Sequence, residues 1–311
     1  MLSTVALPVV AVVLDAAFGD PHALPHPVRA LGACAVRLED WARRLGGGLK
    51  LKGVACMSLL AIGAWCVVAG VAVLPVVGIV ASVYLAYAGL AMGQLLCEAR
   101  HVAGLLDTGL LDEARGALSM LVSRETAHMT EAQVRAGLAE TVSENLNDGF
   151  VAPFFYLVLG GPALLWAYKA VSTLDSMWGY KTERYRDFGW GAARMDDVLA
   201  WIPARLSAVC LVGAALLCGG DVRAALRDVR EHAARSASPN AGWPMAAAAL
   251  LCGRSMGGPA VYFGVEHHKP HLGPEGCEWD AASIAHLLKL VRVAGFLCVV
   301  GLVCLSALAL V

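Results

Sequence analysis

Three acidic residues, Glu140, Glu144 and Asp148, recur at four-residue intervals in the middle of the chain. On a helix this spacing places the three carboxylates on one face. Like charges four residues apart destabilise a helix by roughly 0.2–0.5 kcal/mol per pair, and no Lys or Arg lies within a turn to compensate. We expect this face to meet a cation, either a metal ion or a basic side chain brought in by folding; a solvated acidic face is the alternative. Carboxylate oxygens suit Mg²⁺.

The helix that carries these acids has sequence signals at both ends. Thr130 followed by Gln133 is a capping-box pattern for its first turn. Gly149 is typical of the position just past a helix end, so the helix is expected to stop there. Apolar residues at helical spacing also predict an amphipathic helix over residues 110–121.

A second concentration of polar groups occupies residues 168–205, between two apolar segments. Acidic, basic and aromatic side chains are mixed there with turn-forming residues, whereas most of the chain consists of Ala, Leu, Val and Gly. A loop that only connects two helices does not need this mixture. We interpret the segment as one wall of a polar site held at a membrane.

Two turn-rich segments carry further polar groups. Residues 15–29 contain Asp20, His26 and Arg29, together with three prolines in seven residues that prevent a regular helix there. This segment is either a ligand-binding loop or a rigid turn at the membrane edge. Residues 238–244, which include Ser238 and Asn240, are expected to form a tight turn. Its exposed backbone N–H groups can bind a phosphate. A simple turn is the alternative.

Two weaker patterns lie near the C-terminus. Residues 253–257 match the G-x-S-x-G pattern of a hydrolase nucleophile, but that motif follows a strand, and here a helix-favouring Ala-rich run precedes it. His267, His268 and His271 cluster in a short stretch. A metal site is one interpretation, and a flexible loop is the one we favour.

The composition shows what must position these groups. The chain is 58% hydrophobic and 16% charged, whereas soluble domains average about 45–50% apolar and about 25% charged. We expect an all-α, polytopic integral membrane protein with about five to six membrane segments and amphipathic cytoplasmic helices. Apolar runs cover residues 2–18, 54–74, 76–96, 150–172, 198–219 and 290–311. Residues 1–311 are treated as a single membrane-embedded domain, with polar site segments at 15–29, 123–149, 168–205 and 238–244.

The topology and the ligand class are only partly constrained. Basic residues between positions 37 and 52 predict that residues 19–52 face the cytoplasm. Residues 150–172 are broken at Gly160-Gly161-Pro162, so they either cross the membrane or re-enter, and we favour the re-entrant path.

The net charge of −1 gives no general attraction to nucleic acid. Neither phosphate-binding glycine motif, G-x-x-x-x-G-K-[ST] or G-x-G-x-x-G, is present.

The motifs together resemble the CobD/CbiB family of cobalamin biosynthesis, the adenosylcobinamide-phosphate synthases. The resemblance runs through the chain in order, at residues 15–29 (D-x-x-x-G-D-P-x-x-x-P-H-P-V-R), 123–126 (S-R-E-T), 140–149 (E-T-V-S-E-N-x-x-D-G), 152–155 (A-P-F-F), 168–181 (Y-K-A-V-S-T-L-D-S-M-W-G-Y-K), 192–205 (A-A-R-M-D-D…I-P-A-R) and 238–244 (S-P-N-A-G-W-P). Three positions depart from the family pattern: Ser172 and Ala200 stand where Asn is usual, and Glu125 stands where Asp is usual. These departures leave open a shifted substrate preference.

The resemblance implies a membrane-bound, ATP-dependent amide ligase in the cell (inner or cytoplasmic) membrane. It would join adenosylcobyric acid to aminopropanol phosphate or ethanolamine phosphate, using ATP and Mg²⁺. Under this reading the lipid bilayer is a partner, nucleic acid is not, and the oligomeric state is open. The candidate catalytic residues are Glu140 (the base for the amine), Lys169, Lys181 and Arg194; the candidates for substrate and phosphate binding are Asp20, His26, Arg29, Arg124, Tyr180, Arg205, Ser238 and Asn240; and the candidate metal ligands are Glu144, Asp148, Asp175, Asp196 and Asp197.

Two other classes of protein remain as alternatives. One is a non-enzymatic membrane sensor or regulatory protein, similar to the AmpE proteins of β-lactamase regulation. The other is a small-molecule transporter, in which broken helices and charges in the membrane are expected. A transporter should place polar residues in the middle of its membrane segments, whereas here they gather in loops and at segment ends.

Overall fold

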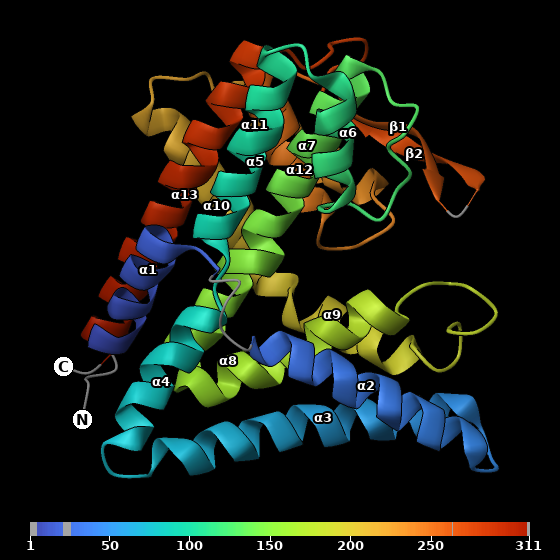
Figure 1. Ribbon diagram of the computed structural model, residues 1–311. Coiled ribbons are helices and arrows are strands. Elements are labelled where there is room, and N and C mark those ends of the chain that lie inside the picture. Colours follow the sequence, from blue (N-terminus) through green and yellow to red (C-terminus); the bar gives the residue numbers. More distant parts are fainter. Residues whose placement is uncertain (1–4, 21–25, 263, 310–311) are drawn as a thin grey trace. The chain divides into compact units, whose positions relative to one another are not determined.

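The computed structural model describes residues 5–20, 26–262 and 264–309. These residues form helices and a two-stranded hairpin (Figure 1). The elements are α1 (Ala6–Phe18), α2 (Pro27–Arg44), α3 (Leu49–Ala72), α4 (Val77–Ala88), α5 (Met92–Asp107), α6 (Leu111–Ser119), α7 (Glu131–Asn145), the π-helix η1 (Leu146–Val151), α8 (Ala152–Trp178), α9 (Trp190–Leu199), α10 (Trp201–Leu217), α11 (Arg223–Arg235), α12 (Gly242–Cys252), β1 (Met256–Tyr262), β2 (Val265–Leu272) and α13 (Ala281–Leu308).

The chain divides into two compact units. Unit 1 comprises Met1–Ala91, Ala152–Ala200 and Gly301–Val311, and unit 2 comprises Met92–Val151 and Trp201–Val300. Unit 1 therefore holds α1 to α4, α8 and α9. Unit 2 holds α5 to α7, η1, α10 to α12, the hairpin and most of α13.

The long apolar helices are those of a multi-pass membrane protein. Among the described residues, four helical segments are long and apolar enough to cross a membrane, namely Leu49–Ala72, Val77–Asp107, Glu131–Trp178 and Ala281–Leu308. A fifth arises if α9 and α10, bent by 45° at Ala200, count as one span. This agrees with the expected polytopic helical fold. The described part of the first apolar run forms the 13-residue α1, which is shorter than the roughly 20 residues of a membrane-spanning helix.

The break expected at residues 160–162 is present within α8. Gly160 and Gly161 leave helical geometry, and Gly161 has a φ of 68° that favours glycine. Pro162 follows at once, and the helix continues to Trp178. The re-entrant path for residues 150–172 stays a prediction, because the bend above 40° lies instead between α9 and α10.

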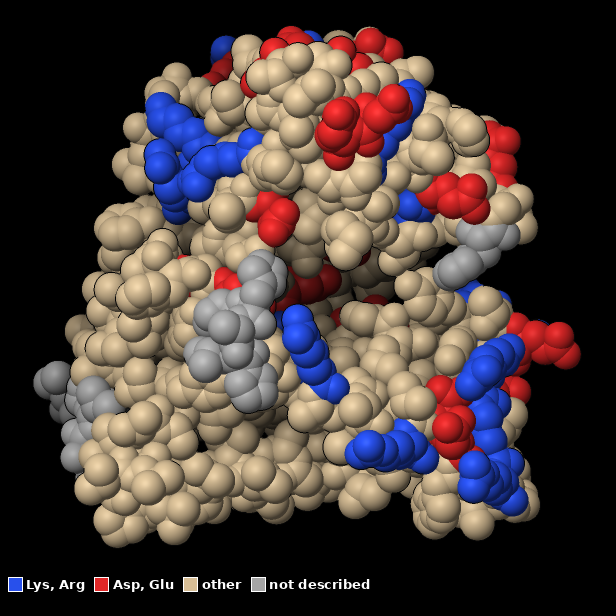
Figure 2. Space-filling view, in the orientation of Figure 1, with Lys and Arg blue, Asp and Glu red and all other residues tan. Residues whose placement is uncertain are grey.

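Unit 1 is organised around the packing of α3 and α8. Figure 1 shows α2 lying alongside α3. The core between these helices is filled by Trp178 at the end of α8 and by Phe188, whose rings meet edge-to-face at 4.7 Å. Figure 2 shows an almost uncharged surface over α3, with charged side chains gathered near its first turns beside α2. An exposed apolar flank of this kind suits contact with lipid.

Close backbone approach explains one glycine of α3. A Cβ on Gly53 would lie 1.8 Å from the Phe188 carbonyl oxygen. Glycine at this position therefore lets residues 188–189 pack directly on α3, which places the start of α9 against the helix.

In unit 2, α7 lies beside α5, α6 and α12. Its first turn carries the expected capping box, in which Thr130 Oγ1 accepts from Gln133 N and Gln133 Oε1 accepts from Thr130 N. The amphipathic helix expected over residues 110–121 is α6, which buries Ala114 and Leu118.

The expected helix end at Gly149 is wrong. The chain passes from α7 through the π-helix η1 directly into α8. The wider turn of a π-helix also changes the residue spacing. Asp148 therefore leaves the regular four-residue repeat that Glu140 and Glu144 share on α7.

The hairpin of unit 2 was not expected from the sequence. Its antiparallel strands pair Tyr262 with Val265 and Gly258 with Lys269, and the register shifts between Met256 and Gly258. The His-rich stretch that we interpreted as a flexible loop is strand β2. The helix α12, rather than a strand, precedes the G-x-S-x-G pattern, which agrees with rejecting the nucleophile motif.

Candidate functional site

The carboxylate of Glu140 is the centre of a charged cluster in unit 2. Its side chain is 4% exposed, and it accepts a hydrogen bond from Arg124, whose side chain is 8% exposed. Lys269 Nζ lies 3.4 Å from Glu140 Oε2, and the Gly257 backbone N–H donates to Oε1 at 2.9 Å. Folding thus brings basic side chains to one of the three acids.

The loop before α7 positions Arg124. The buried Thr126 donates its hydroxyl to the Arg115 carbonyl oxygen at 2.8 Å, which fixes the loop on α6. Glu125 ties the loop to the hairpin, since its N–H donates to Val261 O and its carboxylate accepts from Gly264 N. The residue that departs from the family pattern at this position therefore has a structural role here.

Charge interactions keep both cations of the cluster protonated. Burial lowers the pKa of the Lys269 ammonium, but the Glu140 carboxylate opposes it and leaves that pKa above its ordinary value. The same balance of burial and Glu140 raises the pKa of the Arg124 guanidinium. Both groups therefore carry positive charge at neutral pH.

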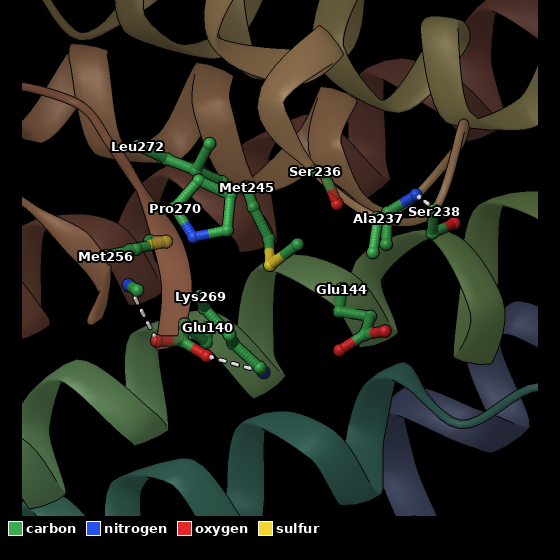
Figure 3. A pocket seen from close by; sticks show the side chains of 12 residues that line it. Glu140, Glu144, Ser236, Ala237, Ser238, Met245, Met256, Lys269, Pro270 and Leu272 are labelled. Carbon is green, nitrogen blue, oxygen red and sulfur yellow. Dashed lines mark hydrogen bonds and ion pairs between the residues drawn. The ribbon is translucent and has the colours of Figure 1, made fainter. Parts of the chain in front are cut away.

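Glu144 lies one helical turn beyond Glu140 and lines a pocket of about 200 Å³. Lys269, Ser236 and Met245 also line it. Figure 3 shows the Glu144 carboxylate and the Ser236 hydroxyl directed into this pocket. Glu144 makes no hydrogen bond or ion pair with any other residue that the structure describes. It is the acid of the cluster that can meet a ligand cation.

The turn over residues 238–241 is stabilised by its own side chains. Ser238 Oγ accepts from the N–H groups of Asn240 and Ala241, so these N–H groups are not exposed as the sequence suggested. Asn240 Oδ1 accepts from Arg205 at 2.8 Å. The Arg205 guanidinium also lies 4.5 Å from the Trp201 ring and 4.8 Å from the Trp243 ring. Arg205 therefore holds the turn that borders the pocket.

Asp148 does not line this pocket. Its Oδ1 accepts from Asn147 Nδ2 at 2.6 Å, and Asn147 Oδ1 accepts from Ser207 of α10 at 3.2 Å. These contacts join η1 to α10 within unit 2.

The remaining candidates lie in unit 1. His26 Nε2 is 3.2 Å from Asp20 Oδ1, and His26 Nδ1 caps α2 by accepting from Val28 N. Arg29 is exposed on α2. Residues 21–25 of the proline-rich segment lie outside the described residues.

The segment of residues 168–205 contributes more to the core than its composition suggested. Tyr168 is buried and stacks on Tyr156 with ring centroids 4.9 Å apart. Tyr180, Lys181 and Arg194 are exposed. The partly buried members are Lys169, Asp175, Asp196 and Asp197, and Arg194 lies 3.7 Å from Asp197.

The five metal-ligand candidates are divided between the two units, with Glu144 and Asp148 in unit 2 and Asp175, Asp196 and Asp197 in unit 1. Within the described part of the chain, no group of three or more His, Cys, Asp or Glu side chains is arranged to hold a metal ion.

Sequence reasoning missed a second buried acid, Glu39 of α2. Its Oε1 accepts from Arg43 at 2.8 Å and from Arg184 at 2.8 Å, and Tyr185 lies 3.4 Å from Oε2. The side chain is 4% exposed. The i,i+4 pairing of Glu39 with Arg43 was readable from the sequence, but the contact with Arg184 spans 145 positions.

Comparison of the sequence with known proteins shows the family of the chain. Residues 8–291 match the family described as CobD/Cbib protein. The chain belongs to the CobD/CbiB family. It is 44% identical over 296 residues to "Cobalamin biosynthesis protein CobD" of Geobacter metallireducens, covering 92% of both chains. It is 41% identical over 303 residues to the CobD protein of Klebsiella pneumoniae, covering 93% of both chains.

A CbiB protein is similarly close. The chain is 39% identical over 303 residues to "Cobalamin biosynthesis protein CbiB" of Salmonella typhimurium, with 93% of both chains covered. No solved structure matches the chain significantly. The charged cluster of unit 2 thus lies in a member of the CobD/CbiB family.

Proposed function

We propose that the protein is an ATP-dependent amide ligase, an adenosylcobinamide-phosphate synthase. It would join a carboxylate of adenosylcobyric acid to the amine of aminopropanol phosphate or ethanolamine phosphate. Membership of the CobD/CbiB family supports a role in cobalamin biosynthesis. The structural observation that carries the proposal is the pocket lined by an acidic and a basic side chain, Glu144 and Lys269, beside the buried Arg124–Glu140 pair.

The reaction needs groups of this kind. A carboxylate is a poor electrophile and must first be activated, and we propose an acyl phosphate. The amine nitrogen then bonds to the carbonyl carbon, the carbon–oxygen bond to phosphate breaks, and phosphate leaves. The amine arrives as an ammonium ion and loses protons in the process, so a nearby base assists the attack.

Glu144 is better placed than Glu140 to act as that base. Three donors occupy the Glu140 carboxylate, from Arg124, Lys269 and Gly257. Glu144 has none among the described residues, and it lines the pocket. We therefore move the base assigned to Glu140 on sequence grounds to Glu144, and assign Glu140 the role of holding Arg124 and Lys269 in position.

ATP would supply the activating phosphoryl group, and Mg²⁺ would accompany its phosphates. Protein sites often hold Mg²⁺ through one or two carboxylates together with substrate phosphates. We propose that one or two of the unit 1 carboxylates, from Asp175, Asp196 and Asp197, would hold the ion together with the phosphates of ATP. The basic candidates for the phosphates in that unit are Lys169, Lys181 and Arg194.

Complementation tests the function. A bacterium that lacks its own CobD/CbiB protein and needs cobalamin to grow would receive this chain, with adenosylcobyric acid supplied. We expect growth with the wild-type chain and with Glu113→Gln, an exposed acid of α6. We expect no growth with Glu144→Gln or Asp196→Asn.

Immunoblots of the membranes would confirm that each variant is present. Growth on supplied cobinamide, which lies beyond the proposed step, would show that the later steps work. The proposal is wrong if the wild-type chain is present in the membrane and supports growth on cobinamide but not on adenosylcobyric acid.

A further inference from the structure

We propose that the pocket lined by Glu144 and Lys269 is the subsite for the phosphoamine, with Lys269 binding its phosphate and Glu144 binding its ammonium group. The inference rests on the proposed ligase function. It adds which part of the chain selects this substrate and which residue meets each of its ends. The pocket and all of its lining residues belong to unit 2.

The size of the pocket favours a small ligand. Its volume is about 200 Å³, whereas pockets for drug-sized molecules are about 300–1,000 Å³. A nucleoside triphosphate or a corrin ring exceeds that space. A short aminoalkyl phosphate fits within it.

The charges of the pocket favour a ligand that carries both signs. Arg124 and Glu140 form the most buried pair of the cluster, with side chains 8% and 4% exposed. The Lys269 side chain is more exposed than either member of that pair. Its Nζ lies 3.4 Å from Glu140 Oε2, and the side chain is 40% exposed. Since Arg124 and Glu140 pair with each other, Lys269 and Glu144 remain as the basic and the acidic side chain that face the pocket.

Lys269 and Glu144 do not neutralise each other directly. The described residues show no ion pair between them, although both line the pocket. A phosphate could form an ion pair with Lys269, and an ammonium group could form one with Glu144. A charge-assisted hydrogen bond of this kind is roughly twice as strong as a neutral one.

The uncharged side chains of the pocket also suit a short aminoalkyl phosphate. The Ser236 hydroxyl, directed into the pocket in Figure 3, can accept a hydrogen bond from an ammonium group. Met245, Met256 and Leu272 supply an apolar wall. Methionine adapts to irregular apolar shapes, so this wall suits a short alkyl chain.

Calorimetric titration of the purified full-length chain in detergent tests the proposal without the whole reaction. The probe is ethanolamine phosphate, without ATP, Mg²⁺ or corrinoid. We expect saturable binding. Ethanolamine, which lacks the phosphate, and ethyl phosphate, which lacks the amine, should each bind about ten- to a hundredfold more weakly, because each loses one charged contact.

Variants assign the two ends. Lys269→Met should weaken ethanolamine phosphate binding by about ten- to a hundredfold and leave ethanolamine binding unchanged. Glu144→Gln should weaken binding to a similar extent and leave ethyl phosphate binding unchanged. The exposed Glu113→Gln is the matched control and should bind like the wild type.

A third variant does not depend on charge. Ala241 lines the pocket and has helical backbone angles, so Ala241→Leu fills the space without backbone strain. This variant should also lose binding. Thermal unfolding of every variant would confirm that it is folded.

The outcomes separate this inference from the proposed function. If the chain forms the amide but Glu144→Gln, Lys269→Met and Ala241→Leu bind ethanolamine phosphate like the wild type, the subsite is elsewhere and the ligase stands. If Mg²⁺ alone binds the wild-type chain and Glu144→Gln abolishes that binding, Glu144 is a metal ligand and the inference is wrong. Binding with the expected variant effects, but no amide formation, would support the pocket and overturn the ligase.

Discussion

Glu140 and Lys269 lie 3.4 Å apart although 129 positions separate them in the sequence. The contact joins helix α7 to strand β2, and the Gly257 N–H of strand β1 binds the same carboxylate. The hairpin is therefore fastened to α7 at the edge of the pocket. Glu140 holds Lys269 beside Glu144 in the arrangement on which the proposed chemistry depends.

Removing Arg124 should destabilise unit 2. Arg124→Met leaves the buried Glu140 carboxylate with only Lys269 and Gly257 as partners. Breaking a buried ion pair costs about 3–5 kcal/mol, and we expect the lower end because two partners remain. Denaturant titration in detergent would measure the loss of unfolding free energy.

The double variant Arg124→Met with Glu140→Leu should recover most of that loss, because it removes the uncompensated charge. Arg227→Met, which breaks an exposed pair with Asp228, is the control and should leave stability unchanged. Equal effects of Arg124→Met and Arg227→Met would contradict the role assigned to the buried pair.

Adding a methyl group at Gly53 should disrupt unit 1. The new Cβ would meet the Phe188 carbonyl oxygen at 1.8 Å, so Gly53→Ala must displace residues 188–189 from α3. Overpacking of this kind costs about 1–3 kcal/mol or more. Gly63→Ala is a control in the same helix, where nothing lies within 4 Å, and alanine should stabilise that site by up to about 1 kcal/mol. Thermal unfolding of both variants would check that Gly53→Ala lowers the stability of the protein and that Gly63→Ala does not.

Glu39 should fix the irregular segment between α8 and α9. Glu39→Gln weakens two charged contacts, to Arg43 and Arg184, and should destabilise the fold by about 1–3 kcal/mol. Limited proteolysis should cut residues 180–187 faster than in the wild type. Asp40→Asn, an exposed neighbour on α2, is the control. The role of Glu39 is refuted if both variants are cut at the wild-type rate.

Acid should loosen the contact between α11 and the end of β2. His232 Nδ1 accepts from Gly273 N at 3.0 Å, which requires the unprotonated ring nitrogen. Burial lowers the pKa of His232, and the nearby Arg235 lowers it further. Since the folded-state pKa lies below the unfolded value, the stabilisation is complete above about pH 6.5 and is lost as pH falls through the folded value.

Hydrogen exchange at Gly273 would follow that loss. In the wild type, exchange protection should decline below about pH 6.5 more steeply than in His232→Gln, whose amide oxygen can accept the same hydrogen bond without titrating. Parallel pH profiles for the two proteins would show that His232 does not control this contact.

Local signals in the sequence predicted the helices that carry the acids. The capping box at Thr130 and Gln133 and the apolar spacing of α6 both depend on residues a few positions apart. The prediction that folding brings a basic group to the acidic face is confirmed for Glu140. The identity of that group was beyond local reasoning, because Arg124 and Lys269 reach Glu140 from a loop and a strand.

Local sequence signals did not predict the hairpin or the π-helix. The strands contain Pro259 and Pro270 and the paired Gly257 and Gly258, which are typical of loops rather than strands. Gly257 and Gly258 have φ values of 96° and 88°, which bend β1 where it meets Glu140. The π-helix at Leu146–Val151 follows α7 without a break, and nothing in the spacing of its residues distinguishes it from a continuing α-helix.

Amide formation by the purified chain tests the central claim most directly. The protein in detergent would be mixed with adenosylcobyric acid, ethanolamine phosphate, ATP and Mg²⁺, and the products resolved by mass spectrometry. We predict the coupled amide with the wild type and with Glu113→Gln, and loss of the product with Glu144→Gln. No coupled product from the folded wild-type chain, while a relative assayed in parallel forms it, would contradict the account.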